Sequence, residues 1–134
     1  MTAIRDLVRG VYAALAEGDA AALGVLLDPG FEAEVSEGMP LGCGGRRTGA
    51  EAMIRDTWWA IGRTYRVRPE AREWIACEDG RLVVLGRYLG RCRSTGQPLD
   101  AAFAHLWTAG DGRLTGLMQV TDTALWAAAL EQPA

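Results

Sequence analysis

Four consecutive segments in the second half of the chain have the composition of β-strands, and short turns separate them. Three turn dipeptides that favour tight hairpins lie between these segments: Asp79-Gly80, Thr95-Gly96 and Asp111-Gly112. The strands themselves are expected over residues 65–77, 81–93, 99–109 and 113–121. A meander of this kind has to bury one face, so the remainder of the chain must cover it.

Helices are expected in front of these strands. Apolar residues repeat every three or four positions from residue 4 onward, and Gly18 ends the first helix. A second helix is expected over residues 20–27. A third, opened by the capping box Thr-Gly-Ala-Glu, is expected over residues 48–63. Between the second and third helices, residues 31–36 alternate apolar and polar positions, which predicts a half-buried strand.

The remaining segments complete a prediction of the fold. Residues 37–47 are rich in glycine and are expected to form a flexible loop, of the kind that closes over pockets. Asp122 is expected to cap a short last helix. Three glycines within strands fit curvature or the close approach of a ligand (Gly86, Gly90 and Gly116). We predict one α+β domain over residues 1–134, in which a curved, mainly antiparallel sheet wraps around the N-terminal helices and encloses a cone-shaped cavity.

The composition argues against several classes of partner and cofactor. With 14 basic and 17 acidic residues the net charge is −3, so no nucleic-acid-binding face is expected. No apolar run approaches the roughly 20 residues that a membrane span needs, and the N-terminus has no signal-peptide pattern. Cysteines 43, 77 and 92 form neither a disulfide framework nor a zinc pattern, and no phosphate-binding or dinucleotide motif is present. We expect a cytoplasmic protein without a metal or a cofactor.

His105, the only histidine of the chain, is the leading candidate for a catalytic residue. Its imidazole, with an ordinary pKa near 6.5, can take up or release a proton at physiological pH. It shares a strand with Phe103 and Trp107, at positions that point to the same face of the sheet. The alternative interpretation is a core histidine whose hydrogen bonds are satisfied.

The partner of His105 depends on the turn at Gly-Asp-Gly, residues 110–112. A three-residue loop with a bulge would place Leu117 opposite His105 and Gln119 on the same face. A strict two-residue turn would place Met118 and Asp122 there instead. We favour the first arrangement, in which Gln119 donates a hydrogen bond to a carbonyl or enolate oxygen. The alternative for Gln119 is a buried amide paired with the backbone.

Other polar residues are weaker candidates for catalysis. Asp122 directly precedes a helix, so capping explains it as well as catalysis does. Glu34 and Glu37 are possible general bases, although solvated carboxylates on the surface are the simpler interpretation. Tyr88 and, from the helix side, Tyr12 can each present a phenolic donor to the cavity or simply pack in the core.

Aromatic and arginine residues indicate how the molecule meets its partners. Aromatic walls suit a flat or extended hydrophobic ligand, for which five side chains are candidates: Tyr12, Trp58, Phe103, Trp107 and Met118. Tryptophans in the core or at a dimer interface are the alternative. Arginines 87, 91 and 93 share a strand face with three apolar residues, which predicts a homodimer through the outer face of the sheet.

Several motifs resemble those of the SnoaL-like branch of the nuclear transport factor 2-like superfamily, over nearly the whole chain. They are Glu17-Gly18-Asp19 between two helices, Arg47-Thr48-Gly49-Ala50-Glu51 at the end of the loop, the Thr95-Gly96 turn, and Asp111-Gly112-Arg113-Leu114 followed by Asp122. The resemblance implies a cone-shaped fold. It spans many activities, including polyketide cyclases, ketosteroid isomerase, dehydratases and plain binding modules.

The resemblance also implies site residues and a function. The histidine of the polyketide cyclases falls on His105 and their acid falls on Gln119, where this chain has an amide. The ketosteroid isomerase base falls near Glu34 to Glu37. The implied function is a cofactor-independent enzyme that cyclises, isomerises or dehydrates a hydrophobic, oxygenated small molecule in natural-product biosynthesis. The alternative is a non-catalytic module that binds such a molecule.

Overall fold

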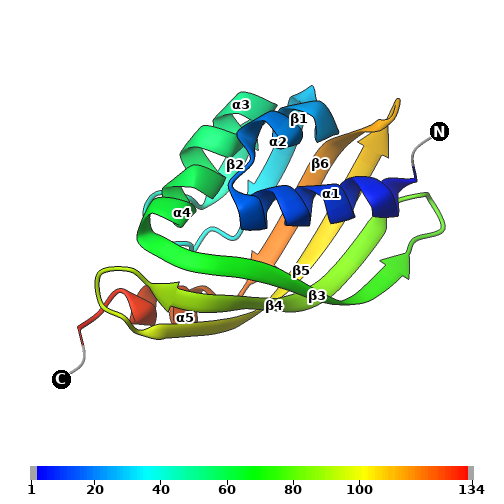
Figure 1. Cartoon of the computed structure of the whole chain (residues 1–134). Coiled ribbons are helices and arrows are strands. Elements are labelled where there is room, and N and C mark those ends of the chain that lie inside the picture. The colour runs from blue at the N-terminus through cyan, green and yellow to red at the C-terminus, as the bar shows by residue number, and fades with distance from the viewer. Residues whose placement is uncertain (1–2, 133–134) are drawn as a thin grey trace.

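The structure is a computed structural model that describes residues 3–132 of the chain. One curved six-stranded sheet carries the N-terminal helices across one face (Figure 1). In chain order, the elements are α1 (Ile4–Glu17), α2 (Ala20–Leu26), β1 (Leu27–Val35), β2 (Gly45–Thr48), α3 (Ala50–Ala52), η1 (Met53–Trp58), α4 (Trp59–Thr64), β3 (Tyr65–Ala76), β4 (Leu82–Cys92), β5 (Pro98–Gly110), β6 (Arg113–Thr121) and α5 (Thr123–Ala129).

The sheet is mixed, with a single parallel pair. Its strand order is β2-β1-β6-β5-β4-β3. Strand β1 runs parallel to β6, and the other neighbours are antiparallel. The α+β class and the four-strand meander β3–β6 are as predicted, and the curled, open sheet under N-terminal helices matches the expected cone.

Two glycines of β4 allow the sheet to curl. A Cβ atom at Gly86 would lie 2.1 Å from the carbonyl oxygen of Glu70, and one at Gly90 would lie 1.9 Å from that of Arg66. Carbon atoms cannot approach backbone oxygens so closely, so β3 can fold over β4 only where β4 lacks side chains. A register shift in β3 between residues 71 and 73 adds to the bend.

Helix α1 closes the concave face because its apolar stripe packs on the sheet. Leu7, Val8 and Val11 are buried there, together with Tyr12. Gly18 ends the helix in the left-handed conformation at φ 68°, as the sequence predicts. Each fully buried aliphatic side chain of this kind stabilises the fold by about 1.5–3 kcal/mol relative to an exposed one.

The segment before the third helix differs from the prediction. The last three residues of the expected loop form strand β2 together with Thr48, and Arg46 of this strand pairs with Glu34 of β1. Strand β1 itself begins at Leu27, four residues before the predicted start, and its register with β6 shifts between Leu27 and Glu32. The glycines of this segment predict a loop, and the strand was missed because β2 is ordered by its pairing with β1 and not by local propensity. The N-cap residue of α3 is Gly49, at φ 98°, and not Thr48 of the predicted capping box. No side chain caps the start of α3.

The third helix is continuous but contains a π-helical turn, η1. Its hydrogen bonds span five residues instead of four, which inserts an extra residue into the turn, so the face that points inward changes along the helix. Met53 is buried, and Thr57, a polar residue, is only 1 % exposed. Trp58 and Ile61 remain half-buried. π-Helical turns of this kind frequently occur at functional sites.

Three further observations bear on the expected partners. Among residues 3–132, no helix has both the length and the apolar character required to cross a bilayer. The same residues contain no group of three or more His, Cys, Asp or Glu side chains that could hold a metal ion. The three cysteines are free thiols.

Candidate active site

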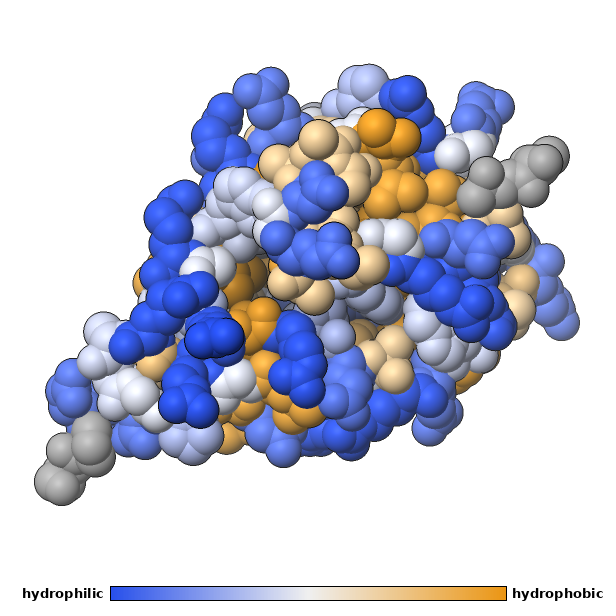
Figure 2. Space-filling model, in the orientation of Figure 1, coloured by the Kyte–Doolittle hydropathy of each residue, from blue (hydrophilic) through white to orange (hydrophobic). Residues whose placement is uncertain are grey.

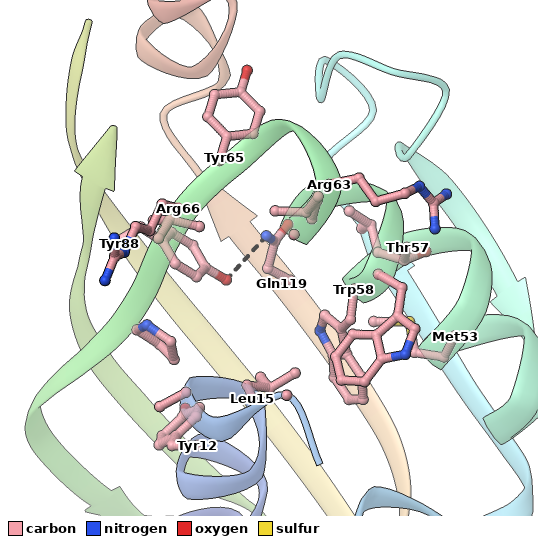
Figure 3. A pocket seen from close by; sticks show the side chains of 18 of the residues that line it. Tyr12, Leu15, Met53, Thr57, Trp58, Arg63, Tyr65, Arg66, Tyr88 and Gln119 are labelled. Atoms are coloured by element: carbon pink, nitrogen blue, oxygen red, sulfur yellow. Dashed lines mark hydrogen bonds between the residues drawn. The ribbon is translucent and has the colours of Figure 1, made fainter. Parts of the chain in front are cut away.

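A cavity of about 520 Å³ lies between the helices and the concave face of the sheet. Figure 3 shows Tyr12 of α1 and Tyr88 and Gln119 of the sheet on one side of it, and Met53 and Trp58 of the third helix on the other. Most of the wall is apolar or aromatic, and its further lining residues include Leu15, Val35, Trp59, Tyr65, Trp107, Leu117 and Trp126. Such a cavity suits a hydrophobic small molecule.

His105 lies on β5 in the cavity floor and is 4 % exposed. Its neighbours across the ladders are Val84 on β4 and Gln119 on β6. The ring of Phe103 stacks on the imidazole with centroids 4.0 Å apart and planes inclined by 17°. Stacking and burial together hold the imidazole in one orientation.

The β5–β6 hairpin places Gln119 beside His105. It has the two-residue turn of one predicted arrangement and a bulge like that of the other. The turn has two central residues, because Gly110 pairs with Arg113, and both Asp111 and Gly112 have positive φ angles. A bulge near Thr108 then shifts the register by one residue. As a result Gln119 lies directly opposite His105, where Leu117 had been predicted.

Both ring nitrogens of His105 are occupied by tyrosines. The Tyr12 hydroxyl lies 2.7 Å from Nδ1, and the Tyr88 hydroxyl lies 2.6 Å from Nε2. Helix α1 supplies one tyrosine and strand β4 the other, so the imidazole joins the helical layer to the sheet. None of these contacts involves a carboxylate.

Donors of fixed direction terminate this network at both ends. The backbone N–H of Ser36 donates to Gln119 Oε1 at 3.2 Å, which orients the amide so that its Nε2 donates to the Tyr88 hydroxyl at 3.1 Å (Figure 3). At the other end, the indole N–H of Trp107 donates to the Tyr12 hydroxyl at 3.2 Å. Each tyrosine oxygen therefore already accepts one hydrogen bond.

Counting protons shows that one phenolic hydrogen is free for a ligand. A neutral imidazole carries one N–H, so it donates to one tyrosine and accepts from the other. The tyrosine that accepts from His105 has its own O–H hydrogen uncommitted. In one tautomer this is Tyr88 and in the other it is Tyr12, and both line the cavity.

The whole network is neutral at physiological pH. Burial lowers the pKa of His105 to about 3, because the imidazolium would lose its hydration. Burial likewise raises the pKa of Tyr12 and of Tyr88, although hydrogen bonds from Trp107 and Gln119 act in the opposite direction. The floor of the cavity is thus a set of neutral donors and acceptors.

The predicted carboxylates lie outside this cavity. Glu34 is exposed and pairs with Arg46 at 3.0 Å, because the alternation of β1 directs it away from the concave face. Glu37 and Asp122 are exposed as well, and Asp122 stands at the N-cap of α5 without a side-chain capping bond. In the described structure none of these acids contacts His105, whose ring nitrogens contact Tyr12 and Tyr88.

Two other expectations about the lining also need correction. Met118 is 49 % exposed on the outer face, because it is paired with Leu106, one residue out of phase with the His105–Gln119 pair. Phe103 lies behind the imidazole and does not itself line the cavity. Trp58 and Trp107 do line it, as does Trp126 of the last helix, which the sequence pattern did not single out.

Exposed residues form the mouth of the cavity, at the end of α1, the end of α4 and the start of β3. Its charged members are Glu17, Arg63, Arg66 and Arg93. Figure 2 shows apolar surface recessed between hydrophilic side chains in this part of the molecule. Arg93 donates to the carbonyl of Gly62 at 2.9 Å and so lies at the mouth instead of on the predicted dimer face. The sequence reasoning missed Arg63 and Arg66, because isolated arginines carry no motif.

The curled sheet, the covering helices and the polar floor of the cavity define a protein of the nuclear transport factor 2-like class. The family model of the SnoaL-like domain matches residues 8–117, so the chain belongs to the SnoaL-like family. No curated protein sequence matches the chain.

Solved structures share the fold over nearly their full length. A nuclear transport factor 2-like protein from Burkholderia thailandensis is 26 % identical, with a TM-score of 0.85 over 98 % of this chain and 99 % of its own. TerC, co-crystallised with polyporic acid, is 26 % identical, with a TM-score of 0.83 over 95 % of this chain and 97 % of its own. A nuclear transport factor 2-like protein of unknown function from Burkholderia pseudomallei is 25 % identical, with a TM-score of 0.84 over 96 % of this chain and 98 % of its own.

Proposed function

We propose that the protein is a cofactor-independent enzyme that activates an oxygen atom of a hydrophobic small molecule by hydrogen-bond donation and proton transfer. The observation that carries this proposal is the His105 network, which always leaves one tyrosine hydroxyl free to donate into an aromatic cavity. The co-crystallisation of the similar protein TerC with polyporic acid supports a small organic ligand for this fold.

The free hydroxyl is suited to stabilise negative charge on a ligand oxygen. When a ketone enolises or is attacked during ring closure, electrons move onto the carbonyl oxygen, and a preorganised donor in a dry site stabilises that charge. The donor tyrosine accepts two hydrogen bonds, one from His105 and one from Gln119 or Trp107. These bonds stabilise the partial phenolate character that it acquires while donating.

Dehydration, isomerisation and cyclisation can all use this arrangement. In a dehydration, the tyrosine gives its proton to the departing hydroxyl group as the carbon–oxygen bond breaks. The N–H of His105 then gives its proton to the phenolate oxygen, and the other tyrosine gives its own proton to the second ring nitrogen. The other tyrosine is then the phenolate, and its oxygen takes up the proton that leaves the neighbouring carbon of the substrate, so that every group is neutral again when water has departed. His105 therefore acts as a relay between two tyrosines and needs no adjacent acid.

A non-catalytic binding module is the second candidate. In the described part of the chain, His105 has no carboxylate partner, and Gln119 occupies the position where the family resemblance implies an acid. Among the described residues that line the cavity, Glu17 is the one carboxylate, and it stands at the exposed mouth. A neutral floor of this kind can bind an oxygenated ligand without transforming it.

Deuterium exchange into a model ketone separates the two candidates. We would incubate 2-tetralone with the protein in D₂O, follow exchange of its α-protons by NMR, and measure its affinity by calorimetry. An enzyme should accelerate the exchange, and both Tyr88→Phe and Tyr12→Phe should reduce the acceleration while the ketone still binds. Binding without acceleration by the wild type favours the binding module.

Two conservative variants serve as controls for this experiment. Glu34→Gln and Asp122→Asn alter the carboxylates that the sequence suggested as catalytic, but neither residue reaches the cavity. Both variants should exchange 2-tetralone at the wild-type rate. A loss of exchange in either would contradict a mechanism based on the two tyrosines.

A further inference from the structure

The mouth of the cavity contrasts in charge with the rest of the molecule. Three arginines and one glutamate line it, which gives the lining a formal charge of 3 − 1 = +2 with His105 neutral. The chain as a whole carries −3. A positive rim around a low-dielectric cavity focuses the electrostatic potential and attracts anions to the opening.

Two of these arginines have no partner in the described structure. Neither Arg63 nor Arg66 forms an ion pair or a side-chain hydrogen bond among residues 3–132, and both are exposed. Several other arginines are paired with carboxylates, as Arg46 is with Glu34 and Arg81 with Asp79, whereas Arg91 and Arg113 are unpaired in the described structure but do not line the cavity. Figure 3 shows Arg63 and Arg66 on opposite sides of the opening.

The elements that carry the two arginines also form the entrance. Arg63 is in the last turn of α4. Arg66 is the second residue of β3, the element that follows α4 in the chain. The apolar lining residues Ile61 and Val67 flank them in sequence and are half-buried. A ligand that fills the cavity from this opening would have its outer end near these two residues.

We propose that the ligand is an anionic hydrophobic molecule whose carboxylate or ionised acidic hydroxyl is bound at the mouth by Arg63 and Arg66. Its apolar body then lies between the aromatic walls, and a neutral oxygen at its inner end meets the tyrosines of the floor. This inference rests on the proposed function and adds to it the charge of the ligand and its direction in the cavity.

The chemistry of the two ends supports this direction of binding. The inner end offers neutral hydrogen-bond partners, and a charge there would lose its hydration without a counter-charge. The outer end offers planar guanidinium groups, whose paired N–H donors match the geometry of a carboxylate. An aromatic acid with a carbonyl or hydroxyl group at its far end satisfies both.

A matched pair of probes tests the inference. 6-Hydroxy-2-naphthoic acid has a hydroxyl at one end and a carboxylate at the other, and its methyl ester has the same framework without the charge. Calorimetry at low ionic strength should show that the acid binds about fivefold to tenfold more tightly than the ester, as expected for two partly exposed charge pairs. The double variant Arg63→Gln/Arg66→Gln should abolish this preference and leave the affinity for the ester unchanged.

A second double variant controls for net charge. Arg91→Gln/Arg113→Gln removes two exposed arginines that do not line the cavity and should keep the preference for the acid. Equal binding of acid and ester by the wild type, or a preference that survives in the Arg63/Arg66 variant, would overturn the inference while the proposed function stands. Failure of both probes to bind would overturn the ligand class of the proposed function and this inference with it.

Discussion

Gln119 faces His105 across the β5–β6 ladder, yet its amide donates to the hydroxyl of Tyr88, 3.1 Å away, and not to the imidazole. Tyr88 in turn occupies the Nε2 of His105. The amide thus acts on the histidine through a tyrosine. Its other end accepts from the backbone N–H of Ser36, so Gln119 fixes the network to the residue that directly follows strand β1.

Replacing Gln119 by alanine should destabilise the protein. The change removes two hydrogen bonds and leaves the backbone N–H of Ser36 without its acceptor in a partly buried place. A loss of about 2–4 kcal/mol in the free energy of unfolding is expected for the unsatisfied groups and the lost packing. Urea denaturation measures it.

The control for this variant is Gln97→Ala, because the side chain of Gln97 makes one long contact, at 3.5 Å, on the surface. Its effect should be below about 0.5 kcal/mol. If the two alanine variants unfold at the same urea concentration, the amide of Gln119 does not organise the floor.

His105 should make stability fall as the solution becomes acidic. Its pKa is about 3 in the folded protein and near 6.5 in an unfolded chain, so the unfolded state binds a proton first. Stability is therefore complete above pH 6.5 and declines between pH 6.5 and about 3, with a slope approaching 1.4 kcal/mol per pH unit from this residue alone. Urea titrations at a series of pH values measure the slope.

A variant and a direct observation isolate this contribution from that of the carboxylates. His105→Gln lacks the titrating ring, so its stability should depend less steeply on pH in the same window. In the wild type, the ring resonances of the single histidine should not shift by NMR while the protein remains folded above about pH 4. A ring that titrates near pH 6.5 in the folded protein would refute the neutral relay.

The outer face of the sheet should mediate a homodimer. Met118 and Val120 of β6 are 49 % and 55 % exposed, and Leu106 of β5 lies beside Met118. Removing such apolar surface from water favours association with a second copy of the chain, as about 25 cal/mol is gained per Å² buried. We expect the wild type to sediment as a dimer and Met118→Asp to sediment as a monomer with an unchanged far-ultraviolet circular dichroism spectrum.

A charge substitution away from this face provides the comparison. Leu41→Asp changes another exposed apolar residue, in the loop before β2, and should leave the dimer intact. A wild type that is monomeric at all concentrations would contradict the proposed interface.

Most helices and strands could be predicted from the sequence, because the patterns that specify them are local. Turn dipeptides and apolar periodicity delimited β3 to β6 and α1, and a family resemblance completed the architecture. Strand β2 was not predicted, because it is ordered by pairing with β1 and its glycine-rich sequence is typical of a loop. The π-helical turn that buries Thr57 was also not predicted, because no local pattern specifies an i+5 hydrogen bond.

The site was predicted less completely because it depends on contacts between distant segments. His105 and Gln119 could be placed on one face of a hairpin, but the bulge that sets their register arises from packing. Tyr12 reaches His105 from 93 residues away, so no spacing rule connects them. The acids near the strand ends were misleading, since their role on the surface is solvation and ion pairing.

The curl of the sheet should depend on Gly86 and not on Gly116, although both interrupt strands. A Cβ at Gly86 would meet the carbonyl oxygen of Glu70 at 2.1 Å and the ring of Phe103 at 2.7 Å. A Cβ at Gly116 would meet nothing closer than 3.5 Å, which is ordinary contact. Gly86→Ala should therefore cost about 3 kcal/mol or more in unfolding free energy, as overpacking does at its upper end.

Gly116→Ala should instead be nearly neutral or slightly stabilising, because alanine restricts the unfolded chain. The effect of Gly86→Ala should also reach the site, since Phe103 supports the imidazole plane from behind. Urea denaturation of both variants, with the affinity for 2-tetralone as a second readout, tests the relationship. Equal stabilities would show that β3 does not need the missing side chain, and the curvature would then have to come from the bulge at residues 71–73 alone.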